Sequence, residues 1–146
     1  MPDFEFRRVL PQDIAFCWSI YREAMQPLTA QLMQWNEENQ RRGIEAALAD
    51  DDASILVSGG GAAGWLHVIE TRRDIHLGHL YLAPEARNHG LGTSFLTWMG
   101  ERAKRKNKSF TLEVLKNNRA RELYERLGFR IIESSPLKHT MQFAGA

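Results

Sequence analysis

The run Ile75–Leu82 constrains the fold of this chain more than any other segment. As an extended strand it places Ile75, Leu77, His79 and Tyr81 on one face and His76, Gly78, Leu80 and Leu82 on the other. Both faces are largely apolar, so the strand is expected in the interior of a sheet that is covered on both sides. The chain has 146 residues, of which 43% are apolar. This length suits one core, and we expect a single domain over residues 1–146.

The other segments alternate between the two-residue period of strands and the period of helices. Strands are predicted at residues 4–9, 54–58, 64–70, 75–82, 110–115, 129–132 and 139–143. Helices are predicted after a cap at Asp13, at about 28–49, at 91–106 and at 120–127, the last closed by Gly128. The glycines at 59–61 predict a hairpin between two of the strands. This order predicts a mixed α/β layer structure.

The charge is balanced, with 19 Lys and Arg against 18 Asp and Glu and a net charge of +1. Such a balance argues against a protein that coats polyanions. Residues 100–130 are locally basic, and this segment either lies near an anionic ligand or forms solvated helix faces. We expect no nucleic-acid partner, because Phe110 and Phe129 alone accompany these charges as stacking side chains.

Cys17 is the chain's one cysteine, so no internal disulfide can form, which favours a reducing compartment. The first eight residues contain no hydrophobic signal core. No later stretch approaches the roughly 18 apolar residues of a membrane span. We therefore expect a cytoplasmic protein without a membrane partner.

A glycine-containing loop joins the central strand to the following helix and reads Arg87-Asn88-His89-Gly90-Leu91-Gly92-Thr93. Gly90 and Gly92 lack a Cβ, so a ligand can approach the backbone closely while the first N–H groups of the helix point outward. This arrangement is typical of a phosphate-binding loop, although two glycines before a helix also form simple tight turns.

Two sequence blocks resemble the GNAT superfamily of N-acetyltransferases. The pattern Arg-x-x-Gly-x-Gly, after a strand that ends Leu80-Tyr81-Leu82-Ala83-Pro84, is similar to the family's acetyl-coenzyme A signature. The block Leu112–Phe129, with its Asn, Ala, Leu-Tyr-Glu and Gly-Phe, is similar to the second family block. The resemblance implies the GNAT fold, a mixed, mostly antiparallel sheet of about seven strands flanked by four helices.

The resemblance also implies acetyl-CoA as cosubstrate, and we expect no metal. Backbone amides from Asn88 to Thr93 would hold the pyrophosphate, and Leu80–Leu82 would pair with the pantetheine arm. A bulge there would splay this strand from the strand at 110–115, and the N–H of Leu82 would polarise the thioester carbonyl. The residues implied in cofactor binding are Leu80, Tyr81, Leu82, Arg87, Asn88, His89, Gly90, Leu91, Gly92, Thr93, Asn117, Asn118, Ala120 and Tyr124.

Tyr124 matches the family tyrosine that protonates the departing CoA thiolate. The alternative is a core tyrosine, because Tyr124 shares an apolar stripe with Ala120, Leu123 and Leu127. The family asparagine corresponds to Asn117 or Asn118, and the count along the strand favours Asn118. Helix capping is the alternative use of either side chain.

An amine must lose a proton before it attacks, and Glu113 is the first candidate for the base, acting through a water. An ion pair at the strand edge is its alternative. Glu70 is the second candidate, either as the base or as the group that orients a cationic substrate. His67, His76 and His79 are weaker candidates, and His76 and His79 lie on opposite strand faces, which makes them a poor metal chelate.

Together these residues predict transfer of an acetyl group to a primary amine by direct attack in a ternary complex, because Cys17 lies far from the motif. The acceptor is a small-molecule amine or an amine of a peptide or protein, and the resemblance leaves room for a homodimer. Trp18, Tyr21, Trp35 and Trp65 line a cation site or pack in the core. The alternative function is a catalytically silent CoA-binding sensor or interaction module.

Overall fold

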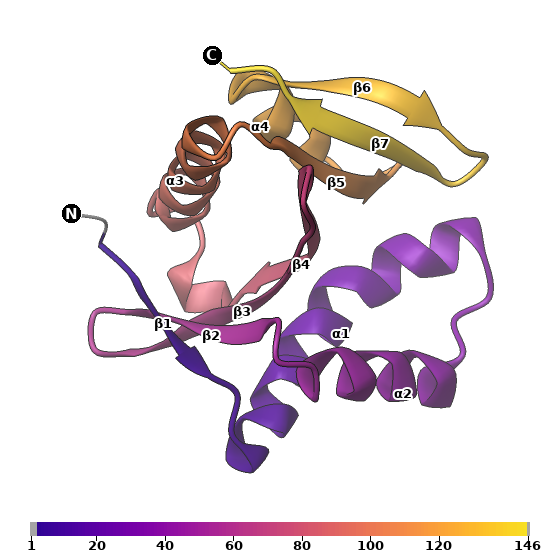
Figure 1. Cartoon of the computed structure of the whole chain (residues 1–146). Helices are drawn as coiled ribbons and strands as arrows, with labels where there is room; N and C mark the ends of the chain where they lie inside the picture. The colour runs from indigo at the N-terminus through magenta and orange to yellow at the C-terminus, as the bar shows by residue number, and fades with distance from the viewer. Residues whose placement is uncertain (1–2, 146) are drawn as a thin grey trace. The chain divides into compact units, whose positions relative to one another are not determined.

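The structure is a computed structural model that describes residues 3–145 (Figure 1). Within these residues the chain forms seven strands and four α-helices. The elements are β1 (Glu5–Arg8), α1 (Ile14–Leu32), α2 (Glu37–Leu48), β2 (Ala53–Ser58), β3 (Gly61–Glu70), β4 (Asp74–Leu82), α3 (Leu91–Arg105), β5 (Ser109–Leu115), α4 (Ala120–Arg126), β6 (Phe129–Ser134) and β7 (Lys138–Phe143). Short 3-10 turns at Pro11–Asp13 and Pro84–Ala86 precede α1 and the glycine loop.

The strands form one sheet in the order β1-β2-β3-β4-β5-β7-β6. β4 pairs in parallel with β5, whereas β1 with β2, β2 with β3, β5 with β7 and β6 with β7 are antiparallel. The parallel ladder runs from Asp74 and Ser109 to Leu77 and Leu112, and both strands extend beyond it. The predicted mixed, mostly antiparallel sheet with four helices is therefore confirmed.

Two compact units make up the chain. The first unit contains residues 1–67 and 79–91, and the second contains residues 68–78 and 92–146. β3 and β4 each contribute residues to both units.

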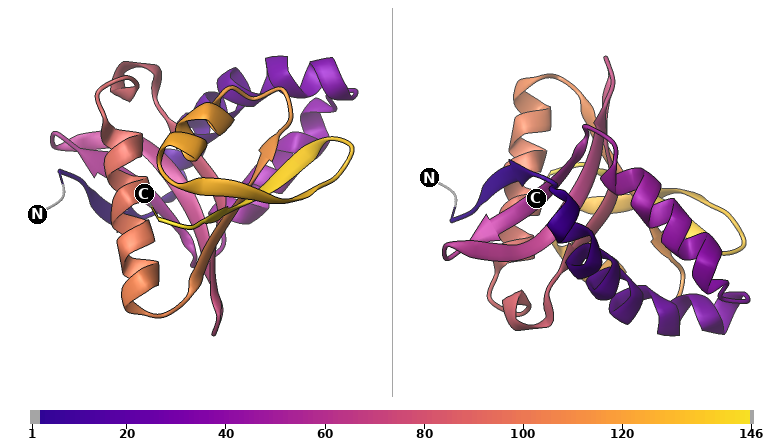
Figure 2. Two further views of the ribbon diagram at one scale, coloured as in Figure 1. Left: turned by 90° about the horizontal axis from the view of Figure 1, so that it is seen from above. Right: turned by 90° about the horizontal axis from the view of Figure 1, so that it is seen from below.

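Aromatic side chains of α1 and β3 form the core of the first unit. Trp65 is fully buried, Trp18 and Tyr21 are nearly so, and the indole N–H of Trp65 donates a hydrogen bond to the Cys17 carbonyl at 3.1 Å. Trp35 is half-buried with its ring 6.1 Å from that of Tyr21. Core packing is thus the observed use of Trp18, Tyr21 and Trp65. Figure 2 shows α1 and α2, which supply most of this core, side by side.

The first two helices differ from the prediction in two ways. α1 runs through Pro27 to Leu32, and α2 begins only at Glu37, so the predicted helix at 28–49 covers the end of one helix and the whole of the next. The Asn36 side chain caps α2 by accepting a hydrogen bond from Asn39 N–H at 3.0 Å. Asp13 stands at the start of α1, yet its carboxylate binds Arg7 and the Leu10 N–H instead of capping the helix.

Three phenylalanines from β5, β6 and β7 pack together at the centre of the core of the second unit. The ring centroids of Phe110, Phe129 and Phe143 lie 5.3 to 6.3 Å apart. Ile75 is the register partner of Phe110 and is fully buried, so it faces this core. Figures 1 and 2 show β6 and β7 as a long hairpin.

The opposite face of the same strands is polar. Register and alternation place seven polar residues there, which we call the polar face: Asp74, His76, Ser109, Thr111, Glu113, Thr140 and Gln142. Glu113 is exposed on this face, and the other six residues are half-buried.

Among residues 3–145 no helix is both long and apolar enough to cross a membrane.

Candidate active site

The backbone of the glycine loop turns sharply just before α3. Asn88 and Gly90 have positive φ angles of 64° and 81°, and α3 begins at Leu91 directly after them. A Cβ built on Gly90 would meet no atom within 4 Å, so the space beside this backbone is open. The first N–H groups of α3 have no carbonyl partner within the helix. The loop therefore fits an anionic group such as a pyrophosphate.

Arg87 fixes the loop to the first unit rather than extending from it. Its Nε donates to the Leu82 carbonyl at 3.1 Å, and its terminal nitrogens pair with the carboxylate of Glu23 on α1. The Glu23 carboxylate raises the pKa of Arg87, and the pKa of Glu23 is lowered in return. Arg87 thus joins the end of β4 to the predicted cofactor loop.

The end of β4 lies very close to β3 at Gly64. A Cβ on Gly64 would overlap the Tyr81 carbonyl oxygen and would lie 3.0 Å from the Leu82 Cα. The Ala83 N–H also donates to the Ala63 carbonyl at 2.8 Å. Glycine is required here because the two backbones leave no room for a side chain. These contacts fix the position of Leu80–Leu82, the segment predicted to bind pantetheine.

In the second unit, α4 carries Tyr124 in a half-buried position with its ring 5.8 Å from that of Phe129. Burial raises the pKa of Tyr124, so the phenol is protonated throughout the neutral range. Asn118 accepts a hydrogen bond from the Ala120 N–H at 2.9 Å, so its side chain stabilises the turn that leads into α4. Arg119 is the N-cap residue of α4, and its side chain makes no capping hydrogen bond.

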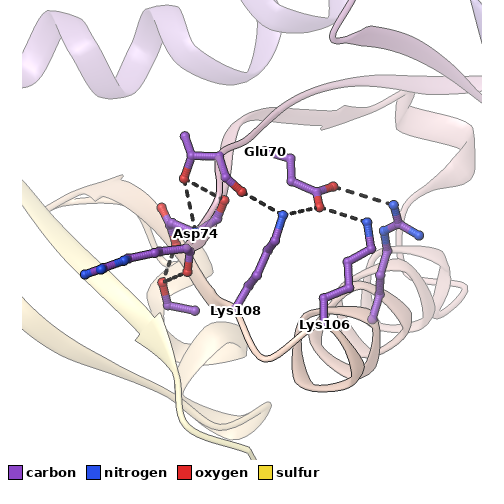
Figure 3. A network of polar contacts seen from close by, with 8 residues as sticks. Glu70, Asp74, Lys106 and Lys108 are labelled. Atoms are coloured by element: carbon purple, nitrogen blue, oxygen red, sulfur yellow. Dashed lines mark hydrogen bonds and ion pairs between the residues drawn. The ribbon is translucent and has the colours of Figure 1, made fainter.

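Glu70 lies in a cluster of cations at the junction of β3 and β4. Its carboxylate contacts Lys108 at 2.6 Å, Lys106 at 2.8 Å and Arg102 at 3.5 Å, as Figure 3 shows for the two lysines. Hydrogen bonds from Lys106 and Lys108 lower the pKa of Glu70 to about 2. A carboxylate held in this way binds protons weakly, which disfavours Glu70 as a general base. Three cations of the basic segment are thereby paired.

Glu113 occupies a different place in the second unit. It is exposed on the polar face of β5, one residue past the end of the parallel ladder. Glu70 instead contacts Lys108, which immediately precedes β5. Five residues of extended chain separate positions 108 and 113, a distance of about 16 Å. The two candidate bases are therefore not brought together.

Cys17 is fully buried, and burial raises the pKa of its thiol to about 12. A thiol that stays protonated at neutral pH is a poor nucleophile. Within the described residues, no three His, Cys, Asp or Glu side chains are grouped so that they could hold a metal ion.

Comparison with known proteins identifies the family. Residues 45–131 match the sequence model of the acetyltransferase (GNAT) domain. The chain belongs to the GNAT acetyltransferase family. No curated protein matches this GNAT chain by sequence comparison.

Solved structures of acetyltransferases share its fold over almost their whole length. The PaiA N-acetyltransferase of Thermoplasma acidophilum, solved in complex with coenzyme A, is 18% identical with a TM-score of 0.68, and the match covers 96% of this chain and 98% of that one. A GNAT-family acetyltransferase of Streptococcus agalactiae has a TM-score of 0.74 at 16% identity, covering 96% and 94%. An acetyltransferase of Thermus thermophilus has a TM-score of 0.70 at 19% identity, covering 97% and 98%.

Sequence reasoning missed two features of this GNAT chain. Glu23, the partner of Arg87, is 64 residues away in sequence, and no local pattern marks it. The hydrogen bonds that Asp74 and His76 share with β5 depend on the β4–β5 register. Alternation alone predicts which residues share a strand face, but not which residue of the next strand lies beside them.

Proposed function

We propose that this chain is an acetyl-CoA-dependent N-acetyltransferase that acts on a primary amine by direct attack in a ternary complex. The observation that carries the proposal is the open, positive-φ loop at Asn88 and Gly90 directly before α3. Bound acetyl-CoA supplies a thioester whose acyl carbon accepts the amine. The coenzyme A complex of the PaiA protein, which shares the fold, supports the choice of cofactor.

The chain's own residues have distinct parts in this proposal. Backbone N–H groups from Asn88 to Thr93 hold the pyrophosphate, where the N-terminus of α3 adds positive potential. The backbone of Leu80–Leu82 binds the pantetheine arm in the manner of an added strand. The Leu82 N–H would polarise the thioester carbonyl. The contacts of Gly64 and Arg87 with this strand end keep its backbone in place.

Proton transfer is divided between two residues. An alkylammonium group has a pKa of about 10.4, so only on the order of one molecule in a thousand is neutral at pH 7. Glu113, exposed on the polar face, is the proposed base and acts through a water. Tyr124, which burial keeps protonated, is the proposed donor to the departing thiolate.

The absence of a reactive thiol in the first unit's core supports direct attack over an acyl-enzyme route. Cys17 is the chain's one cysteine, and its thiol is buried and protonated. The amine therefore takes the acetyl group from acetyl-CoA without a covalent enzyme intermediate on sulfur.

The test is release of free thiol from acetyl-CoA across a panel of amines: amino acids, polyamines, aminoglycosides, and peptides with free N-termini or lysines. Turnover with one class is the expected result and would define the acceptor. Acetyl-CoA binding measured by calorimetry accompanies the panel. Binding without release for any amine would contradict the proposal and favour the silent CoA-binding module.

A further inference from the structure

Four side chains of the polar face form a continuous hydrogen-bonded network within the second unit. The Thr111 hydroxyl donates to Oδ2 of Asp74 at 2.8 Å, and the Nδ1 of His76 lies 2.9 Å from the same hydroxyl oxygen. The other oxygen of Asp74 accepts a hydrogen bond from the Ser109 hydroxyl at 2.7 Å. Asp74 and His76 come from β4, and the two hydroxyls come from β5.

These hydrogen bonds determine which ring nitrogen of His76 carries the hydrogen. Thr111 has one hydroxyl hydrogen, and it is donated to the Asp74 carboxylate, which can only accept. The Nδ1 of His76 must therefore carry a hydrogen and donate it to the Thr111 oxygen. In the neutral imidazole, the lone pair is consequently on Nε2.

The assigned tautomer has a chemical consequence. A proton can bind to Nε2 without breaking any of the three hydrogen bonds of this network. The carboxylate of Asp74 then stabilises the imidazolium through the Thr111 hydroxyl, as a buried aspartate does directly in serine hydrolases. His76 is thus arranged to accept a proton on Nε2, the ring nitrogen that takes no part in these hydrogen bonds.

His76 also lies near the proposed base. Thr111 is its register partner on β5, and Glu113 is two residues further along the same face. With strands about 4.8 Å apart and a rise of about 3.3 Å per residue, the Cα atoms of His76 and Glu113 are about 8 Å apart. Side chains of this length can share one bridging water across that separation.

We propose that His76 is a further catalytic residue of acetyl transfer. Glu113 acts through the water that it holds, and this water passes the proton of the acceptor ammonium on to Nε2 of His76, where it stays. Thr111 and Asp74 are the positioning residues of His76. The inference rests on the proposed function and deepens it. An imidazole nitrogen is a stronger base than a carboxylate oxygen, so it is the better proton acceptor at neutral pH.

One N–H bond of the ammonium breaks, its proton binds to Nε2 of His76, and the electron pair stays on nitrogen. That pair forms the bond to the acyl carbon while the C–S bond breaks and its pair leaves on sulfur. Tyr124 gives its proton to the sulfur. The attacking nitrogen loses its second proton to solvent, which also reprotonates Tyr124 and takes the proton from His76.

The experiment compares His76→Ala with His139→Ala in the full chain, using the amine found active in the panel. His139 is a matched control, because it is also a strand histidine whose Nδ1 contacts a hydroxyl, that of Ser134, at 2.7 Å. We expect His76→Ala to lower kcat about tenfold to a hundredfold with an unchanged KM for acetyl-CoA. Added imidazole should restore part of the lost activity, and His139→Ala should behave as wild type.

A second pair of variants tests the positioning residue. Thr111→Ser keeps the hydroxyl and should retain most of kcat, whereas Thr111→Val removes it and should lose about as much as His76→Ala. Unchanged kcat in His76→Ala would overturn the inference. A second pattern would also overturn it: imidazole fails to restore the kcat of His76→Ala, and Thr111→Ser loses as much kcat as Thr111→Val. That pattern would indicate a structural role for these residues.

Nitrogen-15 NMR of labelled histidine gives a readout independent of turnover. His76 should show the neutral tautomer with hydrogen on Nδ1, and a hydrogen on Nε2 would overturn the inference. A wild-type protein that releases no thiol with any amine would refute the proposed function, and the catalytic role of His76 with it. An active wild type with an unaltered His76→Ala variant would refute the His76 role alone.

Discussion

Replacing Gly64 with alanine tests whether the end of β4 is held by close backbone packing. The added methyl would overlap the Tyr81 carbonyl oxygen and would lie 3.0 Å from the Leu82 Cα, where carbon atoms normally stay about 3.5 to 4.0 Å apart. The obstructing atoms belong to the backbone, so no side-chain rotation relieves the overlap. Overpacking of this kind costs typically 1–3 kcal/mol, and we expect the upper end, about 3 kcal/mol.

Gly43→Ala is the matched control for Gly64→Ala. Gly43 lies inside α2, and a Cβ there would meet no atom within 4 Å. An alanine at this helix position should raise the free energy of unfolding by about 0.5–1 kcal/mol. The two glycine-to-alanine changes are therefore expected to have opposite signs.

Urea unfolding followed by tryptophan fluorescence measures both variants, since Trp65 lies beside Gly64 in the buried core. For a domain of this size, about 3 kcal/mol corresponds to a Tm lower by about 6–12 °C. A Gly64→Ala protein within about 0.5 kcal/mol of wild type would refute the packing argument. Acetyl-CoA affinity should also fall about tenfold in this variant, because the displaced strand includes Leu80–Leu82. Unchanged affinity in a destabilised variant would contradict their assignment to pantetheine.

Three further changes test separate parts of the account. Gly90→Val should lower the affinity for acetyl-CoA at least tenfold, as measured by calorimetry. Gly60→Val is its control, because Gly60 has a similar φ of 83° and equally open surroundings. Both variants should lose stability, but Gly60→Val should keep the wild-type affinity for acetyl-CoA. Equal affinities in the two variants would remove the phosphate role of the loop. Tyr124→Phe should lower kcat on the order of a hundredfold with a Kd for acetyl-CoA within about twofold of wild type, and an undiminished kcat would exclude Tyr124 as the acid. Glu70→Gln should lower the free energy of unfolding at pH 7 by less than about 1 kcal/mol. Because the native carboxyl has a pKa of about 2 against an ordinary 4.5, this difference should vanish as the pH falls from about 4.5 to about 2. A difference that persists at pH 2 would show that charge pairing is not its cause.

The sequence predicted the order of the elements well, because apolar periods and glycines act locally. The glycines at 59–61 mark the β2–β3 hairpin, and the stripes that begin at Leu91 and Ala120 match the starts of α3 and α4. The boundary between α1 and α2 was wrong, because Pro27 is accommodated inside α1 and the true cap of α2 is Asn36. A helix-favouring composition does not reveal where one helix ends and the next begins.

The candidate site was also predictable only where it depends on a local motif. The glycine loop is a contiguous motif, and its positive φ angles at Asn88 and Gly90 are of the kind that such residues permit. Side-chain partners were not predictable, since Glu23 meets Arg87 and Thr111 meets His76 only through the folded register. Glu70 shows the same limit, because three cations around its carboxylate decide its basicity.

The roles of Tyr124 and Glu113, the choice of Asn117 or Asn118, and the single domain over residues 1–146 stay predictions. The roles of Tyr124 and Glu113 rest on the family resemblance and on the burial of the one and the exposure of the other. The choice of asparagine rests on the resemblance, and the single domain rests on the length of the chain. The identity of the acceptor amine also stays a prediction. The aromatic residues that could have formed a cation site, Trp18, Tyr21 and Trp65, are buried in the core of the first unit and do not indicate an acceptor.

The central claim is that acetyl leaves CoA for an amine, and the most direct measurement follows both products in one reaction. Free thiol is measured by its optical reaction with a thiol reagent, and the acetylated amine is quantified by mass spectrometry. The account predicts equal amounts of the two products, both dependent on the amine. Thiol release without an acetylated amine would contradict the account, because it would mean that water, not an amine, receives the acetyl group.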